Sequence, residues 1–174
     1  MNSGVIFREV QRFRQWWLWL VVAMAALSIW FATYRRFALG ERIGMKPTPD
    51  SILLVIWVLI GIGLPVLFYN ARLVTEVRSD GLYLRFFPFH WSFLRFPVDS
   101  IKHSEARTYS PLGEYGGWGI RYGWNGKAYN VSGNQGVQLE FNNGKRILIG
   151  TQHPLDFMSA LRSLQPGTQF SQPT

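Results

Sequence analysis

Two long stretches of uncharged, apolar residues constrain this chain more than any other feature. The first is WWLWLVVAMAALSIWFATY, residues 16–34, and the second is SILLVIWVLIGIGLPVLFY, residues 51–69. As helices, stretches of this length are about 28 Å long, close to the thickness of a bilayer core. A buried helix of a soluble protein shows one polar face, and neither stretch has one. The sequence therefore predicts two transmembrane helices.

The flanks of these stretches support the same prediction. Trp16, Trp17, Tyr34 and Tyr69 stand at the ends, where amphipathic rings prefer the level of the lipid head groups. The first stretch ends in Thr-Tyr-Arg-Arg without a small-residue cleavage site, which favours a retained helix over a cleaved signal peptide. Because the linker 35–50 is too short for a domain, we expect residues 16–69 to form a transmembrane helical hairpin.

The basic residues near the helices predict an orientation. More Lys and Arg residues flank the hairpin on its outer ends (Arg8, Arg12, Arg14, Arg72, Arg78, Arg85) than occupy its loop (Arg35, Arg36, Arg42, Lys46). By the positive-inside rule, both chain ends are expected in the cytoplasm. The net charge of +8 divides evenly between residues 1–70 and 71–174. In the first part the arginines cluster at membrane boundaries, where anionic lipid explains them better than nucleic acid does. The candidate contacts with anionic lipid are Arg12, Arg14, Arg35, Arg36 and Arg72.

Helix-breaking residues interrupt the second stretch at Gly61, Gly63 and Pro65. Such breakers mark binding sites in some transporters. A glycine pair also lets neighbouring helices pack closely, and a membrane helix tolerates proline where a neighbour satisfies the freed carbonyl. Neither stretch contains the ionisable residues that ion pathways need, so close packing is the favoured interpretation.

After residue 70 the pattern changes to short alternating stretches separated by turn residues. Residues 71–78 and 82–87 flank Ser-Asp-Gly and predict a first hairpin. A strand or strand pair is expected in 93–109, where Pro97 indicates an edge strand or a bend. Asn125-Gly126 and Asn143-Gly144 predict two further hairpins, the latter with Val137, Leu139 and Phe141 inward. About seven antiparallel strands are expected.

The end of the chain changes to a helical period. Pro154 suits a first helical position, and apolar residues recur at Leu155, Met158, Leu161 and Leu164. The predicted organisation is an N-terminal cytoplasmic segment at 1–15, the hairpin at 16–69, a β domain at 71–165 and a flexible tail at 166–174.

Residues 115–152 carry a resemblance to a known family. With GGWGIRYG, KAYNVSGNQGVQLEF and LIGTQHP, the chain resembles small, largely uncharacterised bacterial membrane proteins in which two transmembrane helices precede a PH-like (pleckstrin-homology) domain. The resemblance implies a PH-like antiparallel β-barrel or sandwich of about seven strands with a C-terminal helix. It also implies the bacterial inner membrane.

Motifs for catalysis are absent from the sequence. The chain has no cysteine, and its three histidines stand alone rather than at metal-ligand spacing. It lacks G-x-S-x-G, a P-loop and a dinucleotide fingerprint. Gly116, Gly117 and Gly119 lie in a strand pattern that suits close backbone approach or bending of the sheet. We expect no enzyme, no cofactor and no metal. A membrane enzyme that uses clustered carboxylates would need a pocket containing two or more acidic residues. Glu105, Glu114 and Glu140 could gather in space, although nothing in their spacing demands it.

Two surfaces bear on binding. PH-like domains of eukaryotes read lipid head groups with basic residues in and after the first hairpin loop, but residues 79–81 are short and include Asp80. The run FFPFHWSFLRF, residues 86–96, is unusually aromatic and belongs either to the core or to a contact with membrane or protein. The candidate interaction surface is Phe87, Phe89, His90, Trp91 and Phe93.

These observations favour a non-catalytic scaffold or accessory subunit of a membrane protein complex. Its expected partners are membrane lipid and other membrane-protein subunits, bound through exposed strand edges or the aromatic run. A membrane-surface lipid-binding module is the alternative, and a membrane enzyme is a further one.

Overall fold

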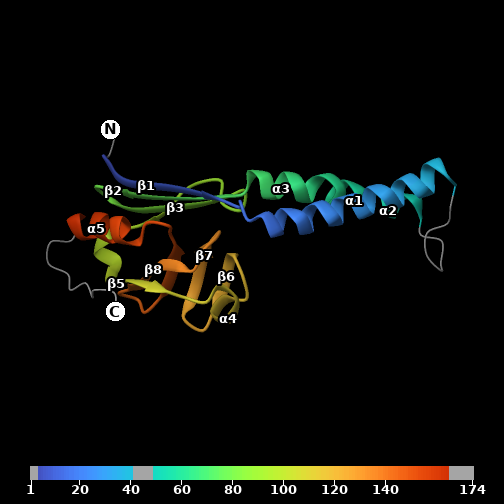
Figure 1. The fold of residues 1–174 in the computed structure, drawn as a ribbon. Helices are drawn as coiled ribbons and strands as arrows, with labels where there is room; N and C mark the ends of the chain where they lie inside the picture. Colours follow the sequence, from blue (N-terminus) through green and yellow to red (C-terminus); the bar gives the residue numbers. More distant parts are fainter. Residues whose placement is uncertain (1–3, 41–48, 165–174) are drawn as a thin grey trace. The chain divides into compact units, whose positions relative to one another are not determined.

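The computed structural model describes residues 4–40 and 49–164, so the predicted tail at 166–174 and the middle of the predicted linker lie outside the described residues. The chain divides into two compact units (Figure 1). One combines Met1–Arg12 with Arg72–Thr174, and the other is Phe13–Ala71. The helical unit is thus inserted, along the chain, between two parts of the β unit.

Two helices make up the helical unit. Helix α1 spans Trp16–Ala38, and the second helix, Asp50–Asn70, consists of α2 (Asp50–Ile56), a π-helical segment η1 (Trp57–Gly63) and α3 (Leu64–Asn70). Both helices are long and apolar enough to cross a membrane. Helix α1 extends beyond the predicted end at residue 34, so that Arg35 and Arg36 occupy its last turn.

Gly61 brings the two helices together. The indole Nε1 of Trp30 donates a hydrogen bond to the Gly61 carbonyl oxygen at 3.1 Å, and a Cβ on Gly61 would lie 3.0 Å from that nitrogen. The Trp30 and Trp57 rings are 5.0 Å apart between centroids. At the far end of the pair, Arg36 binds Asp50 at 2.7 Å. The close packing predicted from the glycines is confirmed at Gly61.

The first sheet of the β unit has the order β1-β2-β3-β4, with β1 Val5–Arg12, β2 Arg72–Arg78, β3 Gly81–Phe87 and β4 Leu94–Phe96. The predicted hairpin at residues 71–87 is β2–β3. Strand β1 corrects the prediction of a segment at 1–15 that is separate from the β domain, because Val5–Arg12 pairs with β2. Its sequence VIFREVQR places polar residues on both faces of the strand, so it lacks the apolar–polar alternation of a typical strand. Gln11 is buried although its side chain carries a polar amide.

The second sheet has the order β5-β8-β9-β7-β6, with β5 Ile101–Thr108, β6 Gly119–Gly123, β7 Gly126–Asn130, β8 Gln135–Phe141 and β9 Arg146–Gly150. The hairpins expected at Asn125-Gly126 and Asn143-Gly144 are confirmed. Pro97 and the 3-10 turn η2 (Val98–Ser100) carry the chain from the first sheet to the second.

Two details of the predicted β fold need correction. The described residues form nine strands rather than about seven. The second sheet is also not wholly antiparallel, because β7 pairs with β9 in parallel. The β6–β7 hairpin lies between β5 and β8 in the chain, and it adds to the free side of β9. A pairing between distant segments of this kind leaves no local turn signal.

Helix α5 (Pro154–Leu164) packs against strands of both sheets (Figure 1). Phe157 is fully buried and stacks on Phe7 of β1, with centroids 5.2 Å apart. Met158 and Leu161 are buried as predicted, whereas Leu155 is exposed. The helix therefore presents Phe157 and Ala160 to the core in place of Leu155, because its contact face is rotated relative to the predicted one.

Of the two roles expected for the glycines after the short helix α4 (Pro111–Tyr115), close backbone approach or bending of the sheet, the structure excludes the first. Gly116, Gly117 and Gly119 all have positive φ, and none would place a Cβ within 3.4 Å of another atom. Their role is therefore backbone conformation rather than close approach. Close approach occurs instead at Gly126, where a Cβ would collide with the Arg146 carbonyl group.

Candidate functional site

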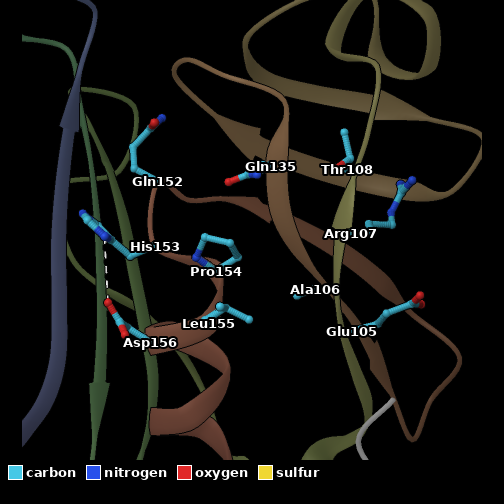
Figure 2. Close-up of a pocket in the computed structure, with 10 residues that line it drawn as sticks. All are labelled: Glu105, Ala106, Arg107, Thr108, Gln135, Gln152, His153, Pro154, Leu155 and Asp156. Carbon is cyan, nitrogen blue, oxygen red and sulfur yellow. Dashed lines mark ion pairs between the residues drawn. The ribbon is translucent and has the colours of Figure 1, made fainter. Parts of the chain in front are cut away.

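A cavity of about 620 Å³ lies between β5 and the start of α5 (Figure 2). Strand β5 contributes Glu105, Ala106, Arg107 and Thr108 to one wall. The opposite wall consists of the turn before α5 and its first residues. The residues of that wall, with one from the start of β8, are Gln135, Gln152, His153, Pro154, Leu155 and Asp156.

Strand β5 is an edge strand, bonded to β8 on one side in the described part of the chain. The Tyr109 amide donates a hydrogen bond to Asn134 O, on the side of β8. Arg107 lies opposite Gly136 and Glu105 lies opposite Gln138, so these two residues also direct their backbone groups toward β8. Backbone groups alternate sides along an antiparallel strand. Ala106 and Thr108 therefore direct their N–H and C=O groups to the outer edge, toward the cavity.

Strand β1 holds the opposite wall in place. The Glu9 carboxylate accepts hydrogen bonds from the Thr151 hydroxyl and, at 2.9 Å, from the Gln152 amide. The Thr151 hydroxyl oxygen in turn accepts from the His153 amide at 3.0 Å. The side-chain amide of the neighbouring Gln11 donates a hydrogen bond to Gly150 O at 2.7 Å. A segment that precedes the apolar helices in the chain thus positions the N-terminus of α5.

A network of side chains anchors β5 on the face of the sheet. The Arg107 guanidinium donates to Glu114 at 2.8 Å, to Gln138 at 3.2 Å and to the Tyr115 hydroxyl at 3.3 Å. Desolvation acts to raise the pKa of Glu114, but the hydrogen bonds from Arg107 and the Ser110 amide outweigh it, and the pKa lies below its ordinary value. Glu114 is therefore ionised at neutral pH, and Arg107 is committed to this network.

The acidic residues around the cavity do not form a pair. Glu105 and Arg107 point away from α5, whereas Asp156 lies on the opposite wall beside His153, 3.8 Å from its Nδ1 (Figure 2). Among residues 4–40 and 49–164, no three His, Asp or Glu side chains gather as metal ligands. The site therefore offers a backbone hydrogen-bonding edge beside an open groove, with a mixed polar and apolar lining.

The predicted aromatic surface lies elsewhere, at the end of β3 and in the β3–β4 connection. Phe89 and Trp91 are 61% and 81% exposed, whereas Phe87, His90 and Phe93 are partly buried. Arg72 lies over the Phe87 ring at 5.5 Å, and Arg85 lies over Phe93 at 4.5 Å. The run is thus divided between core and surface, with Phe86 fully inside the β unit.

The structure separates the predicted lipid-contacting arginines into groups. Arg12 and Arg72 are partners in the β1–β2 register, and Arg72 is the partner of Phe87 in β3. Arg14 follows β1 in the connection to α1. Arg35 and Arg36 belong to the last turn of α1, where Arg36 is paired with Asp50.

The groove is not among the sites predicted from the sequence. Its one local signal is the strand IKHSEART, whose charged residues are typical of an edge strand. The second wall depends on β1 reaching α5 across more than a hundred residues of sequence, a contact without a local signature.

Fold and site together define a class of protein: a two-sheet β domain with a C-terminal helix, interrupted by an apolar helical hairpin and bearing a groove along an edge strand. The chain belongs to a family described as "Family of unknown function (DUF6141)", which it matches over residues 1–166. No curated protein and no solved structure matches the chain.

Proposed function

We propose that this protein is a non-catalytic, membrane-anchored scaffold or accessory subunit whose PH-like domain holds a protein partner at the bacterial inner membrane. The observation that carries the proposal is the groove between β5 and α5. An edge strand with outward N–H and C=O groups can bind an extended peptide as an additional strand. The neighbouring cavity has room for the side chains of that peptide.

The strand order supports a PH-like domain. Strands β1 to β4 form one antiparallel sheet, and β5, β8 and β9 form a second meander that is followed by α5. This is seven strands and a C-terminal helix, the order implied by the resemblance. The β6–β7 hairpin is then an insertion between the fifth and sixth strands of that pattern.

With β1 as the first strand, the connection between the first two strands is the whole helical unit, Phe13–Ala71, and not the turn at Asp80. The loop that carries the lipid-reading basic residues in eukaryotic PH-like domains is thus replaced by a membrane anchor. This replacement supports a role for the domain in binding protein rather than in recognising a lipid head group.

Pairing between β1 and β2 supports the proposed topology. Because both flanks of the hairpin belong to one β unit, both must lie on one side of a membrane that the hairpin crosses. The excess of arginine on these flanks favours the cytoplasmic side.

The test uses the full chain in its native membrane. A photo-crosslinking residue at the exposed position Leu155, on the α5 wall, is expected to capture one defined partner. Thr108→Pro removes an outward N–H without removing a bond to β8, so it should abolish that crosslink. Thr108→Val keeps the N–H and should leave the crosslink intact.

Equal crosslinking in the Pro and Val variants would contradict strand addition at β5. Loss in both variants, with unchanged thermal unfolding, would point to recognition of the Thr108 side chain instead. A protein that yields no crosslink from Leu155 and purifies in mild detergent as a monomer without another subunit would contradict the scaffold role.

A further inference from the structure

The β unit has a second feature that the proposed partner groove does not use: an aromatic tip at one end of the first sheet. We propose that this tip, Phe89 and Trp91 in the β3–β4 connection, inserts at the head-group level of a bilayer, with Arg12 and Arg72 beside it contacting anionic lipid. The inference rests on the membrane anchoring in the proposed function but not on the β5 groove.

Strand register brings the components together. Arg12 of β1, Arg72 of β2 and Phe87 of β3 are successive partners across three adjacent strands. They mark one end of the sheet, and the turn that contains Asp80 lies at the other end of β2 and β3. The basic residues and the aromatic tip therefore share an end that excludes this acidic side chain.

The covalent chain connects this same end of the sheet to both apolar helices. Residues 13–15 separate Arg12 from α1, and Ala71 alone separates Arg72 from the end of α3. Two Cα–Cα steps and one interstrand spacing limit the distance from Asn70 to Phe87 to about 13 Å. If the helices cross a bilayer, the covalent chain therefore tethers near its surface the end of β3 from which the tip extends.

The tip is built to present its rings rather than to bury them. Phe86 is fully buried and anchors the connection, and the His90 amide donates to Phe86 O at 2.8 Å. The His90 ring lies against Tyr129, with centroids 5.9 Å apart. The Trp91 ring rests edge-on against Phe87 at 5.7 Å, yet Trp91 remains 81% exposed. An ordered connection thus holds a large ring outward.

The chemistry of the tip fits a membrane interface better than water. Tryptophan and arginine concentrate at the head-group level, where the ring contacts apolar chains and the guanidinium contacts phosphate. The Arg72 guanidinium over Phe87 and the charge of Lys127 beside His90 add to a basic aromatic surface. A bilayer that contains anionic lipid is therefore the occupant that we assign.

The chain has no cysteine, so single labels can be placed without altering native residues elsewhere. Trp91→Cys and Phe89→Cys, each carrying a nitroxide spin label, are compared in full chain reconstituted into nanodiscs. Two membranes are used, phosphatidylcholine alone and phosphatidylcholine with phosphatidylglycerol. Ile6→Cys, exposed at the opposite end of β1, is the aqueous control, and Leu27→Cys within α1 is the hydrocarbon control.

Labels at 89 and 91 are expected to be at least threefold more accessible to oxygen, relative to a water-soluble nickel relaxant, than the label at Ile6. Phosphatidylglycerol should move both labels deeper into the bilayer. The double substitution Arg12→Gln and Arg72→Gln should remove this effect of phosphatidylglycerol on label depth. Labels at 89 and 91 that match Ile6 in both membranes would overturn the proposal.

Two outcomes distinguish lipid contact by the tip from a failure of membrane anchoring and from contact with a protein partner. A label at Leu27 that is accessible to nickel would show that anchoring itself fails, and it would overturn both proposals. Labels at the tip that are immobilised in native membranes but water-accessible in pure lipid would assign the tip to a protein partner and overturn the lipid contact. The Leu155 crosslink tests the β5 groove and does not depend on where the tip lies.

Discussion

Glu9 shows how one side chain connects distant parts of the β unit. It belongs to β1, before the apolar helices, yet its carboxylate binds the Thr151 hydroxyl and the Gln152 amide at the start of α5. A carboxylate that accepts two hydrogen bonds in a partly buried position stabilises more than a neutral acceptor does. The wall of the groove therefore depends on a residue far away in sequence.

Glu9→Ala is expected to lower the free energy of unfolding of the β unit by about 1–3 kcal/mol, because it leaves the Thr151 and Gln152 donors without their acceptor. Chemical denaturation of the full chain in detergent, followed by near-UV circular dichroism, would measure the loss. Arg8→Ala, at an exposed position of the same strand, is the control, although it also loses an ion pair with Glu76. An unchanged midpoint for Glu9→Ala would contradict this role.

His90 predicts a pH dependence. Desolvation, and then the charge of Lys127, lower its pKa below the ordinary value. As pH falls through about 6.5, the unfolded chain takes up a proton before the folded chain does. The stability that neutral His90 contributes is therefore complete above that pH and is lost as pH falls toward the lowered pKa.

The His90→Gln variant cannot titrate at this position. Between pH 7.5 and 5, its thermal midpoint should fall less steeply than that of the unsubstituted chain, as measured by circular dichroism in detergent. His153→Gln, an exposed histidine on the groove, is the comparison. Parallel pH profiles for His90→Gln and the unsubstituted chain would refute the assignment.

At the scale of the elements, the second apolar helix is specialised around Gly61. The π-helical segment η1 and the absence of a side chain at Gly61 allow the Trp30 indole to reach a backbone carbonyl. The glycine that looks like a helix breaker in the sequence is thus a packing position. The hairpin is stabilised by small-residue contact rather than by buried charge.

Gly61→Leu should disrupt this contact, because even a Cβ would lie 3.0 Å from the Trp30 nitrogen. We expect a loss of about 1–3 kcal/mol, the usual cost of overpacking. Titration with a denaturing detergent, followed by far-UV circular dichroism, would measure it. Val66→Leu, at an exposed position of α3, should have little effect. Equal midpoints for the two variants would show that the contact contributes nothing.

At the scale of the whole molecule, the β unit is discontinuous in sequence. Strand β1 supplies the Phe7 ring that stacks on Phe157, and it covers the edge of β2. A fragment that starts at Arg72 lacks this strand, and β2 becomes an exposed edge whose backbone N–H and C=O groups have lost their partners in β1. Strand β1, Val5–Arg12, is therefore part of the β unit and not an appendage to the helical unit.

A soluble version of the domain follows from this arrangement. Because Arg12 and Arg72 are register partners, a short Gly/Ser linker can replace residues 13–71. We expect the linked chain to unfold cooperatively with a dispersed amide spectrum, and residues 72–174 alone to lack a cooperative transition. A stable, cooperative 72–174 fragment would contradict the structural role of β1. The same two-dimensional NMR measurement serves both chains.

The sequence by itself determined the features that depend on neighbouring residues. Two uncharged stretches of membrane-spanning length specify α1 and the second helix, Asn125-Gly126 and Asn143-Gly144 specify tight turns, and Pro154 begins α5. Each depends on backbone preference or on local hydrophobicity, so a short window of residues is sufficient. The aromatic run was located in the same way, although its division between core and surface was not.

Only the tertiary structure decided the features that join distant segments. The parallel pairing of β7 with β9, the addition of β1 to β2 and the groove between β5 and α5 all depend on contacts across long stretches of chain. Polar residues in β1 hide its strand character, because Gln11 and Glu9 find their partners only at Gly150, Thr151 and Gln152. Such partners exist only once the two sheets and the helix are assembled, and no local pattern encodes them.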